Sequence, residues 1–258
     1  MSVIVMLEDL VIDGPSSVLV VVPARNEQRR LDACLRALTA AVQYLRSADE
    51  TVPVQMVVVL DRCTDRSAEV AARWPDVQTV ATAYGRVGAA RAAGIAHGTA
   101  ALGTDAHAMW IANTDADSEV PADWLLTQLR FARGGVDLLL GLVRPNPAES
   151  ADPLLLAWHD RHDFIDGHRH VHGANMGVRG GLYAAAGGFP DVAVDEDVIL
   201  ARSIRQVGGL VVSTRASPVL TSARLSGRTP AGMAGYLRDL VALPAPDQID
   251  PGLLINIR

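Results

Sequence analysis

The sequence predicts an α/β domain in which helices flank a mainly parallel, twisted sheet. The first observation behind this prediction is a series of short, continuous apolar runs, which are typical of strands buried on both faces. The second is that segments with helical periodicity separate the runs, and strands alternating with helices in this way imply βαβ units. The third is that polar clusters follow several runs, where a parallel sheet places its ligand site.

Four apolar runs in the first half of the chain are predicted strands, and they cover residues 18–22, 54–60, 77–82 and 108–112. The first run stops at Pro23. Apolar residues then recur at helical spacing from Leu31 to Leu45, and Asn26 is a candidate N-cap for that helix.

Three more helices are predicted between and after these strands. Thr64 or Asp65 can cap a helix that runs through Ala72, and residues 87–101 form a helix rich in small residues. Pro121 suits the first position of a further helix, whose apolar residues include Trp124, Leu125, Leu129 and Ala132.

The second half of the chain is less regular. A strand is predicted over 136–143 and a last one over 210–214, with helices over 151–165 and 196–207. Residues 171–179 and the glycine pairs 180–181 and 187–188 read as turns around a short helix. No repeat, low-complexity segment or linker interrupts the chain, so we expect one domain over 1–258.

Composition excludes several classes of protein. A net charge of −6 on 258 residues argues against a general nucleic-acid binder. Cys34 and Cys63 are expected to be reduced thiols, as in a cytoplasmic protein. Residues 1–10 do not resemble a signal peptide, and no apolar stretch approaches the roughly 20 residues that span a bilayer. A soluble, cytoplasmic protein with no transmembrane segment is expected.

The sequence Asp115-Ala116-Asp117 follows a predicted strand directly. Two carboxylates in one turn can hold a hard divalent cation and, through it, a diphosphate. The cation would neutralise charge on a nucleoside-diphosphate leaving group. Solvated loop carboxylates are the alternative, because this short pattern is common by chance.

Polar residues also end the other strands. Asp61 can accept hydrogen bonds from the N3–H of uracil or from the amino and imino groups of guanine. Asn26 and Glu27 can serve the base or ribose, or simply start the helix. Arg91 can reach a phosphate, or lie exposed on its helix.

Glu196 and Asp197 open a predicted helix and are the natural source of a general base. Favourable placement of acids at a helix N-terminus is the alternative explanation, and Asp195 adds a third neighbouring acid. Five histidines at 159, 162, 168, 170 and 172 match no familiar zinc spacing, so the segment is read as a polar loop on the acceptor side rather than as a zinc site. The small residues of 173–177 let backbone approach a sugar closely.

Taken in order, these motifs resemble the family 2 glycosyltransferases of the GT-A fold. The matching pieces, over about 18–222, are Val-Pro-Ala-Arg-Asn-Glu at 22–27, Val-Leu-Asp-Arg-Cys-Thr-Asp-Arg-Ser at 59–67, Gly-Ala-Ala-Arg at 88–91, Thr-Asp-Ala-Asp at 114–117, Gly-Ala-Asn-Met at 173–176, and Glu-Asp-Val-Ile-Leu at 196–200. The resemblance implies the GT-A nucleotide-diphospho-sugar transferase fold, with a nucleotide-binding half at about 18–120 and an acceptor-binding half at about 121–258. It implies a hexosyltransferase that acts with inversion on a UDP- or GDP-linked donor. Small molecules, lipids and glycans all remain open as acceptors, and so does a homodimer.

The resemblance also implies a role for each matched residue. Asp197 would be the general base, with Glu196 in support. Mg2+ or Mn2+ would bind Asp117 and Asp115. The nucleotide would contact Pro23, Arg25, Asn26, Glu27, Asp61, Arg91, Thr114, Asp115 and Ala116. The donor sugar and acceptor would contact His172, Gly173, Ala174, Asn175 and Met176.

The sequence departs from the family in two respects. Many GT-A enzymes supply a late histidine to the metal, and no histidine follows His172 here. Ser222, Arg224 or Arg228 is a candidate diphosphate contact in its place. The Gln-x-x-Arg-Trp signature and membrane helices of processive synthases are also absent from the sequence, which favours addition of a single sugar. A retaining enzyme of the glucosyl-phosphoglycerate synthase type and a catalytically silent nucleotide-sugar-binding protein are the alternatives.

Overall fold

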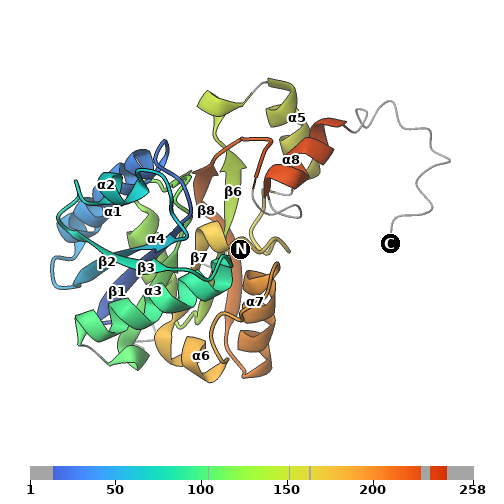
Figure 1. Cartoon of the computed structure of the whole chain (residues 1–258). Helices are drawn as coiled ribbons and strands as arrows, with labels where there is room; N and C mark the ends of the chain where they lie inside the picture. Colours follow the sequence, from blue (N-terminus) through green and yellow to red (C-terminus); the bar gives the residue numbers. More distant parts are fainter. Residues whose placement is uncertain (1–13, 104, 151, 163, 228–232, 243–258) are drawn as a thin grey trace. The chain divides into compact units, whose positions relative to one another are not determined.

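The computed structural model describes residues 14–103, 105–150, 152–162, 164–227 and 233–242 of the chain. These residues divide into two compact units (Figure 1). The first holds the described residues up to Val143 together with Phe164–Thr221. The second holds those of 144–163 and those from Ser222 onward.

The first unit is built on the predicted α/β sheet. Strands β1 to β4 lie in the order β3-β2-β1-β4 and pair in parallel. The register sets Val20 of β1 against Met56 of β2 on one side and Ala112 of β4 on the other. These strands span Ser17–Ala24, Val54–Asp61, Val77–Thr82 and Met109–Asn113, close to the predicted runs.

Beyond β4 the sheet becomes mixed. Strand β7 (Met176–Arg179) runs antiparallel to β4 and to β6 (Leu138–Pro145), and β8 (Val211–Thr221) pairs antiparallel with the two-residue β5 (Ser118–Glu119). The full order is β3-β2-β1-β4-β7-β6-β8-β5. The mainly parallel arrangement that we predicted therefore holds through β4 and changes at β7.

The structure differs from the predicted elements at two of its strands, and it adds a third strand that was not predicted. Residues 176–179 are a strand rather than a turn; Gly177 breaks the apolar run there, and a side chain at that position would collide with Trp110. Strand β8 continues to Thr221 instead of ending at 214. Pro218 and the left-handed Ser217 (φ 51°) interrupt the pattern that predicts a strand. Strand β5 is too short to show a periodicity.

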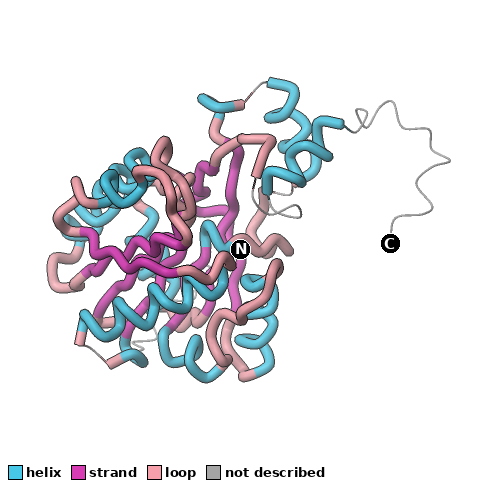
Figure 2. Tube along the Cα trace, in the orientation of Figure 1, coloured by secondary structure: helices cyan, strands magenta, loops and turns pink. Residues whose placement is uncertain are grey.

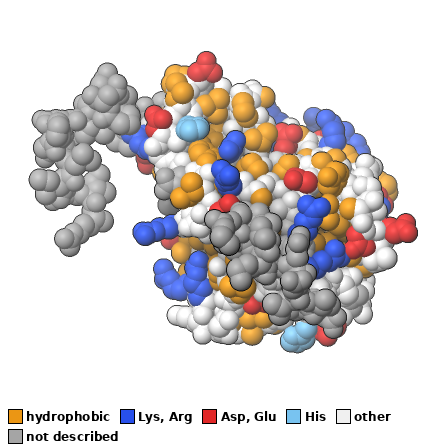
Figure 3. All heavy atoms as spheres, turned by 180° about the vertical axis from the view of Figure 1, so that it is seen from behind, with side chains coloured by type: hydrophobic (Ala, Val, Ile, Leu, Met, Phe, Trp, Pro, Cys, Tyr) orange, Lys and Arg blue, Asp and Glu red, His pale blue; other side chains and the backbone are white. Residues whose placement is uncertain are grey.

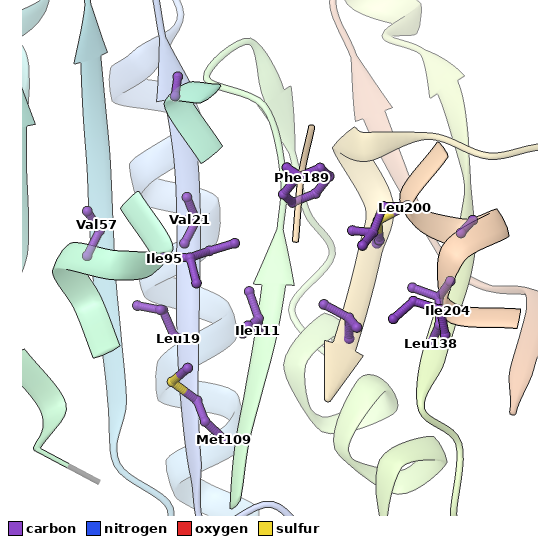
Figure 4. Packing of buried hydrophobic residues seen from close by; sticks show 14 of the residues in the cluster. Leu19, Val21, Val57, Ile95, Met109, Ile111, Leu138, Phe189, Leu200 and Ile204 are labelled. Carbon is purple, nitrogen blue, oxygen red and sulfur yellow. The ribbon is translucent and has the colours of Figure 1, made fainter. Parts of the chain in front are cut away.

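Helices pack on both faces of this sheet (Figure 2). On one face, α3 (Val87–Leu102) and α7 (Glu196–Gln206) cover a core that includes Leu19, Val21, Ile111 and Leu138 (Figure 4). Helix α3 lies close to the strands because it is rich in small residues; a Cβ at Gly94 would stand 2.6 Å from Val59. The alternate residues of the strands face the opposite way.

The opposite face is covered by α1 (Leu31–Ala48) and α4 (Trp124–Arg133), which contact each other. Trp110 of β4 donates a hydrogen bond to Gln128 of α4 at 2.7 Å on this side. Short helices α2 (Ser67–Ala71) and α6 (Gly180–Ala185) complete the unit, so Gly180–Gly181 begin a helix rather than forming the predicted turn.

The predicted helix starts are displaced by a few residues. Helix α1 begins at Leu31 with Arg30 at its N-cap position, so Asn26 does not cap it. Helix α4 begins at Trp124 rather than at Pro121. Before α1, Asn26 instead bonds to the loop after β2, and before α4, Asp123 accepts a hydrogen bond from the Ser217 hydroxyl of β8 at 3.1 Å.

The second unit contains α5 (Asp152–Arg161) and α8 (Met233–Ala242), which pack together. Trp158 stacks on His162 with ring centroids 3.6 Å apart, and Tyr236 of α8 meets both rings edge-on. Helix α5 is shorter than the predicted 151–165, and α8 lay outside every predicted element.

In the described part of the chain, no helix has the length and apolar character needed to cross a membrane. Neither cysteine forms a disulfide in this part, as expected. On the face drawn in Figure 3, acidic and basic side chains of the described residues are interspersed with apolar ones.

Candidate active site

Strands β1, β2 and β4 of the first unit end at one edge of the sheet, and the predicted nucleotide-binding residues follow them. Asp61 at the end of β2 is 4% exposed. One carboxylate oxygen accepts a hydrogen bond from the Thr82 hydroxyl at 3.0 Å, and the other accepts one from the Gly85 amide at 2.7 Å. The loop after β3 therefore fixes the orientation of this carboxylate.

The loops after β1 and β2 are tied together by side chains. Asn26, in a left-handed conformation (φ 54°), accepts hydrogen bonds from the amides of Thr64 (2.7 Å) and Asp65 (3.3 Å). In return, Asp65 accepts one from the amide of Gln28 at 3.0 Å, and the Ser67 hydroxyl accepts one from the amide of Glu27 at 2.8 Å. Asn26 thus joins two loops instead of starting a helix. Glu27 is buried beside them.

The acidic motif directly follows β4, as predicted. Asp115 and Asp117 are half-buried, and Ala116 between them is buried. The Cys34 thiol of α1 donates a hydrogen bond to the Asp115 carbonyl at 3.3 Å. Burial, reinforced by the charges of Asp117 and Asp115, raises the pKa of Cys34 far above its usual range, so the thiol stays protonated.

Arg91 of α3 is buried beneath this motif and contacts two of the predicted site carboxylates. Its guanidinium donates a hydrogen bond from Nη2 to Asp115 at 2.6 Å and one from Nη1 to Glu196 at 2.5 Å. The side chain is 2% exposed, and its Cζ lies 5.5 Å from the ring centroid of Phe189. Burial disfavours the charged form, but Asp115, Glu196 and Asp197 outweigh that effect and raise the pKa of Arg91. The arginine is therefore a permanent cation that joins the acidic motif to α7.

Glu196 and Asp197 begin α7, as predicted, but their surroundings differ. Glu196 is buried against Arg91, and burial, together with the charge of Asp197, raises its pKa although Arg91 opposes the shift. Asp197 is half-buried and accepts hydrogen bonds from the amides of Gly173 and Val198, at 2.7 and 2.8 Å. The two adjacent acids therefore have separate partners.

The segment 173–176 lies against these residues. A side chain at Gly173 would collide with the Arg91 guanidinium, so this glycine permits the close approach. The Asn175 side chain accepts from the Trp124 indole at 2.8 Å and donates to the carbonyls of Leu142 (2.8 Å) and Ser217 (3.1 Å). Ala174 is buried and Met176 lies in the core, while His172 stacks at 5.8 Å on His170.

Some buried polar atoms at this edge have no hydrogen-bond partner among the described residues. They are Nε of Arg91, both amide atoms of Asn113 and the hydroxyl of Thr114. Buried polar groups are nearly always satisfied, so such atoms are expected to bond to a ligand or to water. Asn113 was not predicted as a site residue, because a single polar residue at the end of an apolar run reads as the edge of a strand.

The remaining predicted residues lie in several places. Pro23 and Arg25 are half-buried at the end of β1. Arg224 belongs to the second unit, where its amide donates to the Ser222 hydroxyl at 3.3 Å and that hydroxyl donates to Glu149 at 2.8 Å. Arg228 lies outside the described residues. No sequence pattern pointed to Phe189, which lies against Arg91, or to Gly85, whose amide donates to Asp61.

The described residues contain no cluster of three or more His, Cys, Asp or Glu side chains arranged to hold a metal ion by themselves. The carboxylates of Asp115 and Asp117 lie in the loop that follows β4, at this edge of the sheet. Two protein carboxylates are enough for Mg2+, which usually completes its coordination with water and substrate phosphates.

Solved structures that match the chain include glycosyltransferases. Residues 1–349 of TarS from S. aureus, in complex with UDP-GlcNAc, match with a TM-score of 0.60 and 13% identity, over 88% of this chain and 65% of that one. The mannosyltransferase PcManGT from Pyrobaculum calidifontis, in complex with GDP-Man and Mn2+, matches with a TM-score of 0.58 and 20% identity, over 83% and 58%. GalNAc-T7 with UDP, GalNAc and Mn2+ has a TM-score of 0.58 and 13% identity, over 91% and 48%.

These likenesses confirm the GT-A fold. The chain spans less than two thirds of the length of each of these three proteins. No curated protein matches the sequence. A family model does: the model described as "Glycosyl transferase family 2" matches residues 19–177, more than half of the chain. The chain therefore belongs to glycosyl transferase family 2.

Proposed function

We propose that the chain transfers a sugar, a hexose in the simplest case, from a nucleoside-diphosphate sugar to an acceptor hydroxyl, with inversion at the anomeric carbon. The observation that carries this proposal is the contact of Arg91 with both Asp115 and Glu196. It brings the acidic motif and the paired acids of α7 into one site. An inverting displacement needs stabilisation of the leaving diphosphate and a base for the acceptor in the same place.

The donor nucleoside is proposed to bind over the loops that end β1 and β2. Asp61 accepts one hydrogen bond at each oxygen from the protein. A carboxylate has about four lone-pair positions, so Asp61 retains the capacity to accept from a base. Uracil offers one N–H donor and guanine offers two. UDP and GDP are therefore both suitable, and TarS and PcManGT bind donors of these two kinds.

The residues of the site fit a divalent cation. Asp115, Glu196 and Asp197 share one buried arginine, and Asp117 adds a further carboxylate beside Asp115, so negative charge is in excess. Mg2+ or Mn2+ held by Asp117 and Asp115 would reduce this excess. When bound, such an ion supplies Lewis-acid stabilisation of the diphosphate leaving group.

Asp197 is the proposed general base. The acceptor oxygen forms a bond to C1 of the donor sugar while the bond from C1 to the diphosphate oxygen breaks, and the hydroxyl proton passes to the Asp197 carboxylate. Its two amide contacts hold this carboxylate in place, and its half-buried position leaves it accessible. Glu196 is less suited to act as the general base, because its carboxylate forms an ion pair with Arg91.

The acceptor and the donor sugar are proposed to contact His172 and the backbone of 173–176. The side chain of Asn175 is committed to the scaffold, so its contribution would come from the main chain. A small molecule, a lipid or a glycan would suit a site of this kind, and we propose that the chain acts as one functional domain.

A thermal-shift experiment tests the nucleotide and metal sites first. UDP, GDP and TDP are each added with and without Mn2+. A ligand at about 100 times its Kd stabilises by about 2.7 kcal/mol, which is a rise in Tm of roughly 5–10 °C for a protein of this size. We expect one diphosphate to give such a shift with Mn2+, and Asp117→Asn to reduce it. No shift with any diphosphate would refute the proposed donor.

The stereochemistry and the base are tested with the diphosphate identified in this way. NMR of the product is expected to show an anomeric configuration opposite to that of the donor. Asp197→Asn should lower kcat by at least about a hundredfold, as expected for loss of a general base, with little change in donor Kd. A retained configuration together with a fully active Asp197→Asn variant would indicate a retaining enzyme.

A further inference from the structure

We propose that Arg91 is a positioning residue that couples the acidic motif to the general base, with Glu196 as its counter-ion. This inference rests on the proposed function. It gives Arg91 a role different from the direct phosphate contact that the sequence suggested, and it separates the roles of Glu196 and Asp197.

The burial of Arg91 favours a positioning role over contact with substrate. The side chain is 2% exposed, covered on one side by Phe189 and on another by Gly173. The planar guanidinium in this position holds two carboxylates in a fixed geometry. An ammonium group has no such planar fork and would not fix their positions. Both terminal nitrogens are used, one for Asp115 and one for Glu196.

The contacts of Arg91 extend to Asp197 through the backbone. Gly173 packs directly on the guanidinium, and the amide of Gly173 donates to Asp197 at 2.7 Å. A displacement of Arg91 would therefore move the donor that orients the base. Helix α3 also contacts α7 directly, because a Cβ at Gly88 would lie 2.9 Å from the Cβ of Glu196.

The same contacts connect Glu196 to the cation site. Arg91 shares its charge between Asp115 and Glu196, and each carboxylate weakens the hold of the arginine on the other. Without the charge of Glu196, Arg91 would pair more strongly with Asp115, and the region would also be less negative. Both effects reduce the attraction of Asp115 and Asp117 for a divalent cation. Glu196 should therefore strengthen cation binding without touching the cation.

Two variants with different expected results test this coupling. Glu196→Gln keeps an oxygen that accepts from Arg91 but removes the charge. We expect its Kd for Mn2+, measured by calorimetry on the protein with and without a saturating diphosphate, to rise at least about fivefold. Arg91→Lys keeps the positive charge but loses the planar guanidinium that contacts both carboxylates. We expect kcat to fall at least tenfold while the Kd for Mn2+ changes less than in Glu196→Gln.

Arg202→Lys is the matched control, because Arg202 lies exposed on α7 and should alter neither quantity. A Glu196→Gln variant that binds Mn2+ as tightly as the unmodified chain would overturn the proposal. So would an Arg91→Lys variant with full kcat. If Arg91→Lys does not fold, the Glu196→Gln titration decides alone. The Mn2+ titration needs no transfer activity, so it confirms or overturns the coupling even in a protein that transfers no sugar, and that lack of transfer would refute the proposed function alone.

Discussion

The Asn175 side chain offers a direct test of whether a residue that matches the family pattern acts on the sugar or on the scaffold. Its amide joins α4, β6 and β8 through Trp124, Leu142 and Ser217. Replacing it by alanine leaves the buried indole N–H without an acceptor, at a cost of about 1–3 kcal/mol. The two carbonyls lose one donor each and add about 0.5–1.5 kcal/mol apiece. We expect Asn175→Ala to lower the free energy of unfolding by about 4 kcal/mol.

The measurement is urea-induced unfolding of the variant and of the unmodified chain, with the m-values compared. Trp124→Phe is the control, because phenylalanine lacks the indole N–H that Asn175→Ala leaves without an acceptor. The double variant should lose about 1–3 kcal/mol less than the sum of the two single losses. A loss below about 1 kcal/mol in Asn175→Ala, together with a raised KM for the donor, would refute the scaffold role and favour direct contact of the side chain with the sugar.

Four further predictions concern other contacts. Gly98→Ala should cost about 1–3 kcal/mol in urea unfolding, because the new methyl group collides with the fully buried Leu19. Cys34 should resist alkylation in the native state, since burial raises the pKa of its thiol, and mass spectrometry should find it modified only after unfolding. His168 should make the protein less stable in acid, because burial lowers the pKa of its imidazole from 6.5. The stability that the neutral imidazole contributes is complete above pH 6.5 and is lost as the pH falls. His168→Gln should therefore reduce the slope of the unfolding free energy against pH. Asn26→Ala should cost about 1–2 kcal/mol and Asn26→Gly less, because glycine accepts the left-handed backbone there; equal losses would contradict this reasoning.

The sequence predicted the parallel half of the sheet because buried parallel strands leave continuous apolar runs. Strands β1, β2 and β3 follow such runs closely, and the polar residues after β1, β2 and β4 meet at one edge as expected. The antiparallel half leaves a weaker pattern. Strand β7 has four residues including a glycine, and β8 contains a proline, so neither shows the alternation that identifies a strand.

The sequence motifs named residues that the structure brings close together, but they did not predict the contacts among these residues. Motif order identified Arg91, Asp115, Glu196 and Asp197. It could not show that Arg91 is buried between two of these acids, because that depends on how α3 and α7 pack side by side on the sheet. Asn26 illustrates the same limit: a polar residue just before a helix suggests a cap, whereas the neighbouring loop provides donors that only the fold brings near.

The bonds between the loops after β1 and β2 affect the thermodynamics of donor binding. Asn26, Gln28 and Ser67 connect these loops within the protein itself, before any nucleotide arrives. Little conformational freedom would then remain to be lost when a nucleotide binds, and such preorganisation increases affinity without adding contacts. Loosening the loops with Asn26→Ala should therefore make the entropy of nucleotide binding less favourable while leaving the Asp61 carboxylate available to the base.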